Sequence, residues 1–273
     1  MPAAAQCGAR PEPCEVDAPR WTGELATLSA NALLAGLTAG VVQRWRGGSF
    51  EEAFARGALG GAGIYAGKRI AVEDFAGAGL IGREVAAVGA SVARNALDGL
   101  PPLERLILPL GPVRLHFRRG HRPSARLDAI ALGWIAWAVA ERELDFDMGE
   151  SLSAGAPVFR TRGSILSFGD DSVHAAGVTA AGVVVLSRVP GFGDAFERRS
   201  SAHERVHVIQ QDQLFTLWVD PAEEWALERW RFTRAAGRWV DFNLSTELLR
   251  TFGRLFPEHA ERPWELESIF LAR

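Results

Sequence analysis

The segment SAHERVHVIQQDQ, from Ser201 to Gln213, contains two histidines four positions apart, with a glutamate directly after the first. On a helix that turns about 100° per residue, His203, Glu204 and His207 fall within one sector, so their side chains point into a common space. Such a cluster is the arrangement that a metal site requires. The same spacing is also typical of an amphipathic helix that carries surface histidines, and the residues around the segment must decide between the two interpretations.

Upstream of this helix, from about residue 111 to 190, the apolar pattern changes from a helical period to a period of two, which is typical of half-buried strands. One run, AIALGWIAWAVA from Ala129 to Ala140, is apolar on both faces and fits either a pair of central strands or a buried helix. We expect a central antiparallel β-sheet in this region. The predicted strands are VRLHFR (113–118), LDFDM (144–148), SILSFG (164–169) and VVVLSR (183–188).

The chain from Trp21 to about Leu110 is rich in Gly and Ala and has helical spacing. Its first segment, LATLSANALLAGLTAGVV (25–42), carries no charge over 18 residues, which reaches the length of a membrane-spanning helix. Later apolar runs in this region are too short to cross a bilayer. Membrane association through residues 25–42 and a soluble helical bundle therefore both remain open. Three small-xxx-small pairs are compatible with either, namely Gly36 with Gly40, Gly57 with Gly61 and Gly63 with Gly67.

These patterns predict an α+β fold with a Gly-rich helical N-terminal region, a central antiparallel β-sheet and C-terminal helices that carry the HExxH motif. We divide the 273 residues into a flexible leader (1–20), a Gly/Ala-rich helical region (21–110) and a region of sheet and helices (111–273). A net charge of −3 without a basic run argues against a nucleic-acid partner. Cys7 and Cys14 of the leader could form a disulfide if the chain is exported. A membrane-associated or exported protein, on the periplasmic side, is slightly favoured over a cytoplasmic one.

The HExxH segment resembles the motif of the zincin metallopeptidases, and its extension HVIQQ is similar to HExxHxxQQ segments of uncharacterised bacterial proteins predicted to be metallopeptidases. The resemblance covers about 45 residues, from Val183 to Trp230. It implies a Zn²⁺ ion held by His203 and His207, with Glu204 as the general base that takes a proton from a metal-bound water. The substrate would be a protein or peptide.

The resemblance also suggests a third metal ligand. In the gluzincin branch this ligand is commonly a glutamate on the following helix, in an ExxA setting, and Glu223 with Ala226 matches that setting after a turn at Asp220-Pro221. Glu224 is its rival. The strand VVVLSR lies upstream of the motif helix, where the family keeps the edge strand that aligns substrate. Zincins often have a further side chain that donates a hydrogen bond to the oxyanion of the reaction. By this resemblance either His174 or His259 would take that role, and the sequence does not choose between them.

The surroundings of the motif give further expectations, and an alternative function remains open. Arg205 stands where zincins usually carry an uncharged residue, which predicts either that the back of the helix is exposed or that it is paired there with an acidic neighbour. The tryptophans around the proposed second ligand helix, Trp218, Trp225 and Trp230, are expected to form the core that fixes it. The alternative function is a non-enzymatic, membrane-associated structural or assembly protein built on the Gly-rich helices.

Overall fold

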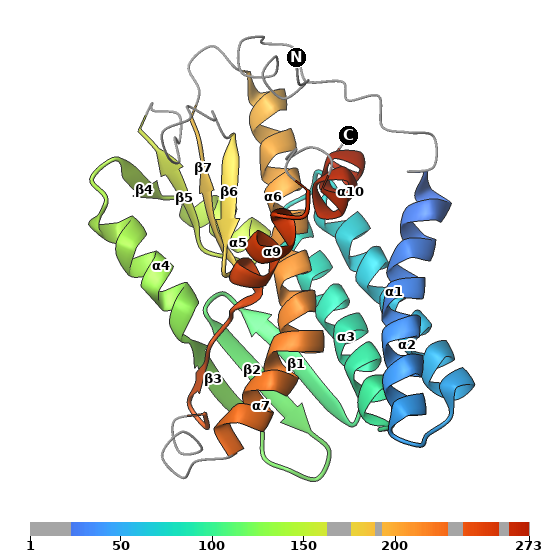
Figure 1. Cartoon of the computed structure of the whole chain (residues 1–273). Helices are drawn as coiled ribbons and strands as arrows, with labels where there is room; N and C mark the ends of the chain where they lie inside the picture. The colour runs from blue at the N-terminus through green and yellow to red at the C-terminus, as the bar shows by residue number, and fades with distance from the viewer. Residues whose placement is uncertain (1–22, 163–175, 189–192, 229–236, 257–261, 273) are drawn as a thin grey trace.

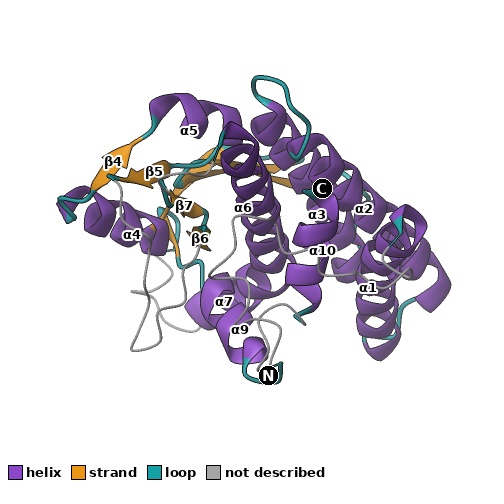
Figure 2. Cartoon of the chain, turned by 90° about the horizontal axis from the view of Figure 1, so that it is seen from above, coloured by secondary structure: helices purple, strands orange, loops and turns teal. Residues whose placement is uncertain are grey.

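The protein combines helices with two small sheets. The computed structural model describes residues 23–162, 176–188, 193–228, 237–256 and 262–272. Figure 2 shows the long helix α6 (Asp194–Leu214) in the middle, with the strands on one side and the helices α1, α2 and α3 on the other. The helix that carries the HExxH motif is therefore enclosed by both parts of the fold.

Three long antiparallel neighbours form the helical layer: α1 (Glu24–Trp45), α2 (Phe50–Ala71) and α3 (Ala78–Asp98). Glycines of the middle helix, α2, face both neighbours. A Cβ atom at Gly57 would lie 2.7 Å from the carbonyl oxygen of Ala35 on α1. A Cβ atom at Gly60 would lie 2.6 Å from the backbone nitrogen of Ala93 on α3. Glycine is required at these positions because the helix backbones nearly touch.

Helix α1 has a large apolar face toward the outside. Within the described residues it is the one helix that is long and apolar enough to cross a membrane. Only 33% of its 18-residue apolar segment is buried inside the protein. The exposed side chains on this face are Leu25, Leu33, Leu34, Leu37 and Val41. The opposite face packs against α2 through Ala35, Gly36, Ala39 and Gly40.

The residues that the structure describes form two four-stranded sheets, where the sequence predicts one antiparallel sheet. Their strand orders are β1-β2-β3-β8 and β4-β5-β7-β6, and the pairs β3–β8 and β5–β7 are parallel. The single-sheet prediction was wrong because alternation identifies a half-buried strand but does not select its partner. The strands are β1 (Arg105–Leu110), β2 (Val113–Arg118), β3 (Ser124–Asp128), β4 (Leu144–Phe146), β5 (Val158–Thr161), β6 (Gly177–Ala180), β7 (Val183–Leu186) and β8 (Val240–Asp241).

The predicted boundary at residue 110 falls between two paired strands, because β1 and β2 form an antiparallel hairpin. The predicted strand over residues 164–169 lies outside the described residues. The predicted strand over 144–148 ends at Phe146, since the side chain of Asp147 accepts a hydrogen bond from the backbone of Glu150 and caps α5 (Met148–Ala154).

The ambiguous apolar run forms helix α4 (Ala129–Ala140). The carboxylate of Asp128 accepts a hydrogen bond from the backbone N–H of Ala131 at 3.0 Å and caps the helix. One face of α4 packs through Trp134 and Ile135 on the second sheet. Its unbroken apolar character does not mean full burial, because Val139 on the other face is exposed.

The motif helix does not end at a turn. After α6 comes a π-helical turn, η3 (Phe215–Val219), and then α7 (Asp220–Glu228), so the chain continues in helical form through Asp220 and Pro221. Proline lacks a backbone N–H, and the wider π turn just before it accommodates the lost hydrogen bond. The predicted turn at Asp220-Pro221 was therefore wrong.

Ion pairs attach the back of α6 to its surroundings. Arg205 lies 2.7 Å from the carboxylate of Glu150 on α5, and Asp212 forms a buried ion pair of 2.6 Å with Arg83 on α3. Of the two interpretations of Arg205, pairing with an acidic neighbour is confirmed. The C-terminal helices α9 (Ser245–Gly253) and α10 (Pro263–Leu271) pack against α6 as well.

Candidate metal centre

His203 and His207 lie on successive turns of α6 and face α10. Their Nε2 atoms are 3.0 Å apart. The residues between and after them, Val206, Val208 and Ile209, are buried in three different core clusters. Because these apolar contacts fix the rotation of α6, the two imidazoles are held toward the same point.

The carboxylate that joins them is Glu265 of α10. Its Oε2 atom lies 3.2 Å from Nε2 of His207 and 3.3 Å from Nε2 of His203. Glu265 occupies the first turn of α10, which begins with Pro263 at a position where the missing N–H is tolerated. Among the described residues, this is the one group of three His, Cys, Asp or Glu side chains with the spacing of a metal site.

Glu223 is not part of this group. It lies 16 residues beyond His207 on a chain that stays helical, which places it about 24 Å further along the helix axis. There its carboxylate accepts a hydrogen bond from the backbone N–H of Phe242. Burial, together with the nearby carboxylates of Asp241 and Asp220, raises the pKa of Glu223 to about 8. The side chain of Glu224 lies outside the described residues.

The three ligand-type atoms form a nearly equilateral triangle with sides of 3.0, 3.2 and 3.3 Å. Two ligands of a tetrahedral zinc ion, each about 2.0–2.1 Å from the metal, are separated by about 3.3–3.4 Å. The His203 side chain is 24% exposed, whereas those of His207 and Glu265 are largely buried. A cation could therefore touch all three atoms and keep one side open.

The tautomer of His207 follows from its other neighbour. Its Nδ1 atom lies 2.8 Å from Oε1 of Gln210, while the amide nitrogen of Gln210 donates to Trp264 O and to Glu267. Because the Gln210 oxygen accepts, Nδ1 of His207 carries the proton, and Nε2 of the neutral ring presents a lone pair toward Glu265. A lone pair and a carboxylate oxygen at 3.2 Å need a proton or a metal ion between them.

The electrostatic environment favours such a positive charge. Burial by itself would lower the pKa of His207, but the carboxylate of Glu265, with a smaller contribution from Glu204, outweighs burial and raises this pKa to about 9. In the absence of a metal, the ring is therefore protonated at neutral pH. A divalent cation would replace that proton.

Glu204 lies beside the histidines and faces the second sheet. Its Oε2 atom accepts a hydrogen bond of 2.7 Å from Thr179 of β6. A Cβ atom at Gly177 would stand 2.8 Å from Oε1 of Glu204, so glycine at this position lets the strand approach the carboxylate. The strand beside the motif is thus β6, the last strand of its sheet among the described residues. The predicted edge strand, β7, is a central strand buried at all four positions.

Other expectations about the surroundings can also be located. His174, His259 and Trp230 lie outside the described residues. Trp218 and Trp225 do not form a core and are 51% and 65% exposed, because the helix that carries them does not fold back on α6.

Sequence reasoning missed Glu265 because 58 residues separate it from His207. A usable signal was present: PWELES starts with a proline, as many helices do, and places Glu265 and Ser268 three positions apart on one face. The hydroxyl oxygen of Ser268 lies 3.4 Å from Nε2 of His203, so this face of α10 does meet the histidines.

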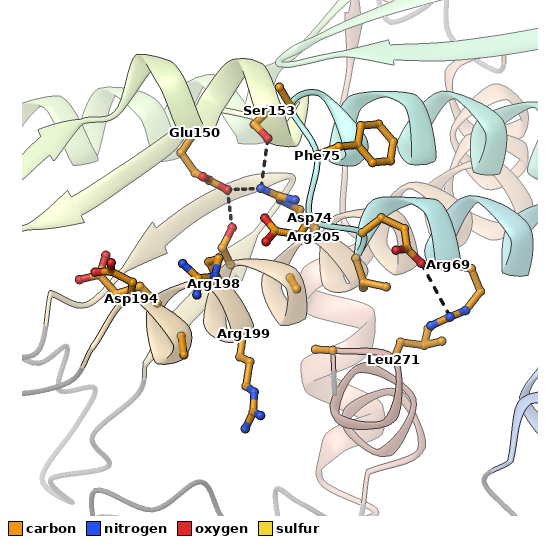
Figure 3. Close-up of a pocket in the computed structure, with 18 of the residues that line it drawn as sticks. Arg69, Asp74, Phe75, Glu150, Ser153, Asp194, Arg198, Arg199, Arg205 and Leu271 are labelled. Carbon is orange, nitrogen blue, oxygen red and sulfur yellow. Dashed lines mark hydrogen bonds and ion pairs between the residues drawn. The ribbon is translucent and has the colours of Figure 1, made fainter.

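A pocket of about 770 Å³ lies on the opposite side of α6. Figure 3 shows Arg205 extending from α6 to Glu150 and Ser153 in this pocket. Arg160, another of its lining residues, is paired with Glu197. Neither histidine is among the described residues that line this pocket, so it is separate from the candidate metal centre.

In comparisons with known proteins, the chain matches no family model, no curated protein and no solved structure. The resemblance to zincins therefore rests on the sequence motif.

Proposed function

We propose that the chain is a zinc-dependent metallopeptidase of the zincin type, in which His203, His207 and Glu265 hold Zn²⁺ and Glu204 is the general base. The observation that carries the proposal is the triangle of two imidazole nitrogens and one carboxylate oxygen, with all sides between 3.0 and 3.3 Å. Two histidines and one glutamate, with a fourth position open, are a typical ligand set of catalytic zinc.

The donor chemistry supports zinc rather than magnesium or calcium. Two neutral imidazoles and one carboxylate suit zinc, whereas magnesium and calcium prefer oxygen ligands. The hydrogen bond from His207 Nδ1 to Gln210 is the kind of outer contact that orients a metal-binding imidazole. When bound, zinc supplies Lewis acidity, which lowers the pKa of a coordinated water to about 7 and polarises a carbonyl group.

Glu204 accepts and returns the proton in this proposal. Thr179 donates to Oε2 of Glu204, which leaves Oε1 to take a proton from water and deliver it to the leaving amine. The substrate is an extended peptide, because β6 is the last described strand of its sheet and a peptide can pair with such an edge.

The test uses Glu204→Gln, which keeps the size of the side chain but removes the base. We expect this variant to bind Zn²⁺ as the wild type does and to lose hydrolysis of labelled casein by a factor of at least about 100. Glu150→Gln, on α5 at the opposite side of α6, is the matched control and should retain activity. Hydrolysis by Glu204→Gln at the wild-type rate would remove Glu204 from its role, and a wild-type protein that binds no Zn²⁺ would end the proposal.

Membrane association through residues 25–42 is a second proposal, carried by the outward apolar face of α1. The face is bounded by Glu24 at one end and by Arg44 and the exposed Trp45 at the other, as charged and aromatic residues bound a membrane segment. Co-sedimentation with phospholipid vesicles tests it. Leu34→Glu with Leu37→Glu should abolish binding, and unchanged binding would contradict this role of α1. Zinc binding separates an anchored enzyme from the alternative of a purely structural membrane protein, and it should survive these substitutions.

A further inference from the structure

Behind the candidate metal centre lies a chain of buried polar side chains from four helices. Gln210 of α6 contacts Glu267 of α10 at 2.8 Å, and Glu267 contacts Lys68 of α2 at 2.7 Å. Asn31 of α1 donates to Oε1 of the same glutamate at 2.7 Å and accepts from Lys68 at 3.0 Å. Lys68 is 1% exposed. A buried ammonium group is costly unless it is paired, so its presence at this place calls for a reason.

We propose that Lys68 and Glu267 are positioning residues, which fix the tautomer and orientation of His207 through Gln210. This inference rests on the proposed function, since it concerns residues that contact the ligand His207 through Gln210 and do not touch the metal themselves. It also gives the Gly-rich helices a role in the chemistry, because they bring Lys68 and Asn31 to the carboxylate.

The first step concerns the amide of Gln210, which can face either way in isolation. Its nitrogen lies 2.8 Å from Oε2 of Glu267 and 3.0 Å from the carbonyl oxygen of Trp264, and both of these atoms only accept. The amide oxygen must therefore point the other way, toward Nδ1 of His207 at 2.8 Å. With that oxygen as acceptor, the proton of the neutral imidazole stays on Nδ1 and the lone pair on Nε2 faces the metal position.

The second step concerns Glu267, which has to remain a pure acceptor. The ion pair with Lys68 keeps its carboxylate charged, and the amide of Asn31 holds the second oxygen. If residue 267 were an amide, it could present either an oxygen or an N–H group to Gln210. The orientation of Gln210 would then depend on Trp264 alone.

The third step concerns how closely the helices approach. The carbonyl oxygen of Asn31 lies against Gly61 of α2, where a Cβ atom would collide with it. Glycine at this point lets α1 and α2 come close enough for Asn31, Lys68 and Glu267 to share hydrogen bonds.

The test measures Zn²⁺ affinity with a competing chelator at 25 °C, together with the melting temperature. The double variant Lys68→Met/Glu267→Gln removes both charges while keeping side chains of similar size, so no unpaired charge is left in the core. We expect its Zn²⁺ affinity to fall by about 10-fold or more, as is usual when an outer partner of a metal ligand is lost. The visible spectrum of the Co²⁺-loaded variant should differ from that of the wild type, because the His207 ring changes its orientation.

The matched control is Arg205→Met/Glu150→Gln, which removes an ion pair of the same 2.7 Å length from the other side of α6. It should lower the melting temperature but leave Zn²⁺ affinity within a factor of two.

The outcomes separate the two proposals. If the wild type binds Zn²⁺ and Lys68→Met/Glu267→Gln binds it equally well, the positioning role is overturned and the metal site stands. A wild type that binds no Zn²⁺ overturns both.

Discussion

In the metal-free protein, the raised pKa of His207 makes folding stability depend on pH in a defined direction. The structure raises this pKa from 6.5 to about 9, mainly through Glu265 acting against the effect of burial. A group with a raised folded-state pKa contributes stability that is fully present below pH 6.5 and is lost as the pH rises through 9. Since one pKa unit corresponds to about 1.4 kcal/mol, the contribution is about 3 kcal/mol.

The assay is urea unfolding in EDTA at several pH values between 6 and 9.5, for the wild type and for His207→Gln. Other groups titrate in both proteins, so the difference between their free energies of unfolding isolates His207. We expect this difference to shrink by about 3 kcal/mol from pH 6 to pH 9.5. Saturating Zn²⁺ should remove most of this pH dependence in the wild type, because the metal takes the place of the proton. A difference that stays constant across this pH range would refute the reasoning.

Three further predictions test the fold around the site. Glu223→Gln should stabilise the protein by about 1–2 kcal/mol at pH 9 and not at pH 4.5, because burial raises the pKa of Glu223 to about 8 and the charged carboxylate destabilises the folded state at high pH. Urea unfolding at the two pH values measures this, and equal effects at both would contradict it. Gly60→Val should cost about 1–3 kcal/mol in thermal unfolding by forcing α2 from α3, whereas Gly133→Ala, where a Cβ meets open space, should stabilise by about 0.5–1 kcal/mol. Arg83→Met should cost about 3 kcal/mol by removing the closer of the two arginines that pair with the buried Asp212, since Arg114 remains 3.9 Å away, and adding Asp212→Asn should recover part of the loss; a cost below about 1 kcal/mol would show that the ion pair is unimportant.

The local part of the site could be predicted from the sequence. Helical spacing alone brings His203 and His207 to one face, and the structure places their Nε2 atoms 3.0 Å apart. The sequence left Arg205 either exposed or paired with an acidic neighbour, and the partner, Glu150, is 55 residues away and could not be named.

The distant part could not be predicted. The choice of Glu223 assumed that the chain turns back at Pro221, and proline does usually end a helix. Here the π turn from Phe215 to Val219 carries the helix past that point. Glu265 reaches the histidines only through the packing of α10 on α6; the segment PWELES marks the start of a helix but does not say which helix it packs against. In the same way, the sheet partners of β3 and β7 depend on tertiary packing.

The metal ligands themselves provide the most direct test. Zn²⁺ dissociation constants of Glu265→Gln and Glu223→Gln should be compared with that of the wild type under identical buffer conditions. We predict that Glu265→Gln weakens binding by more than the roughly 10–100-fold that the loss of an outer partner costs, and that Glu223→Gln leaves it unchanged. Equal affinity of Glu265→Gln and wild type, or loss of zinc from Glu223→Gln, would contradict the proposed centre.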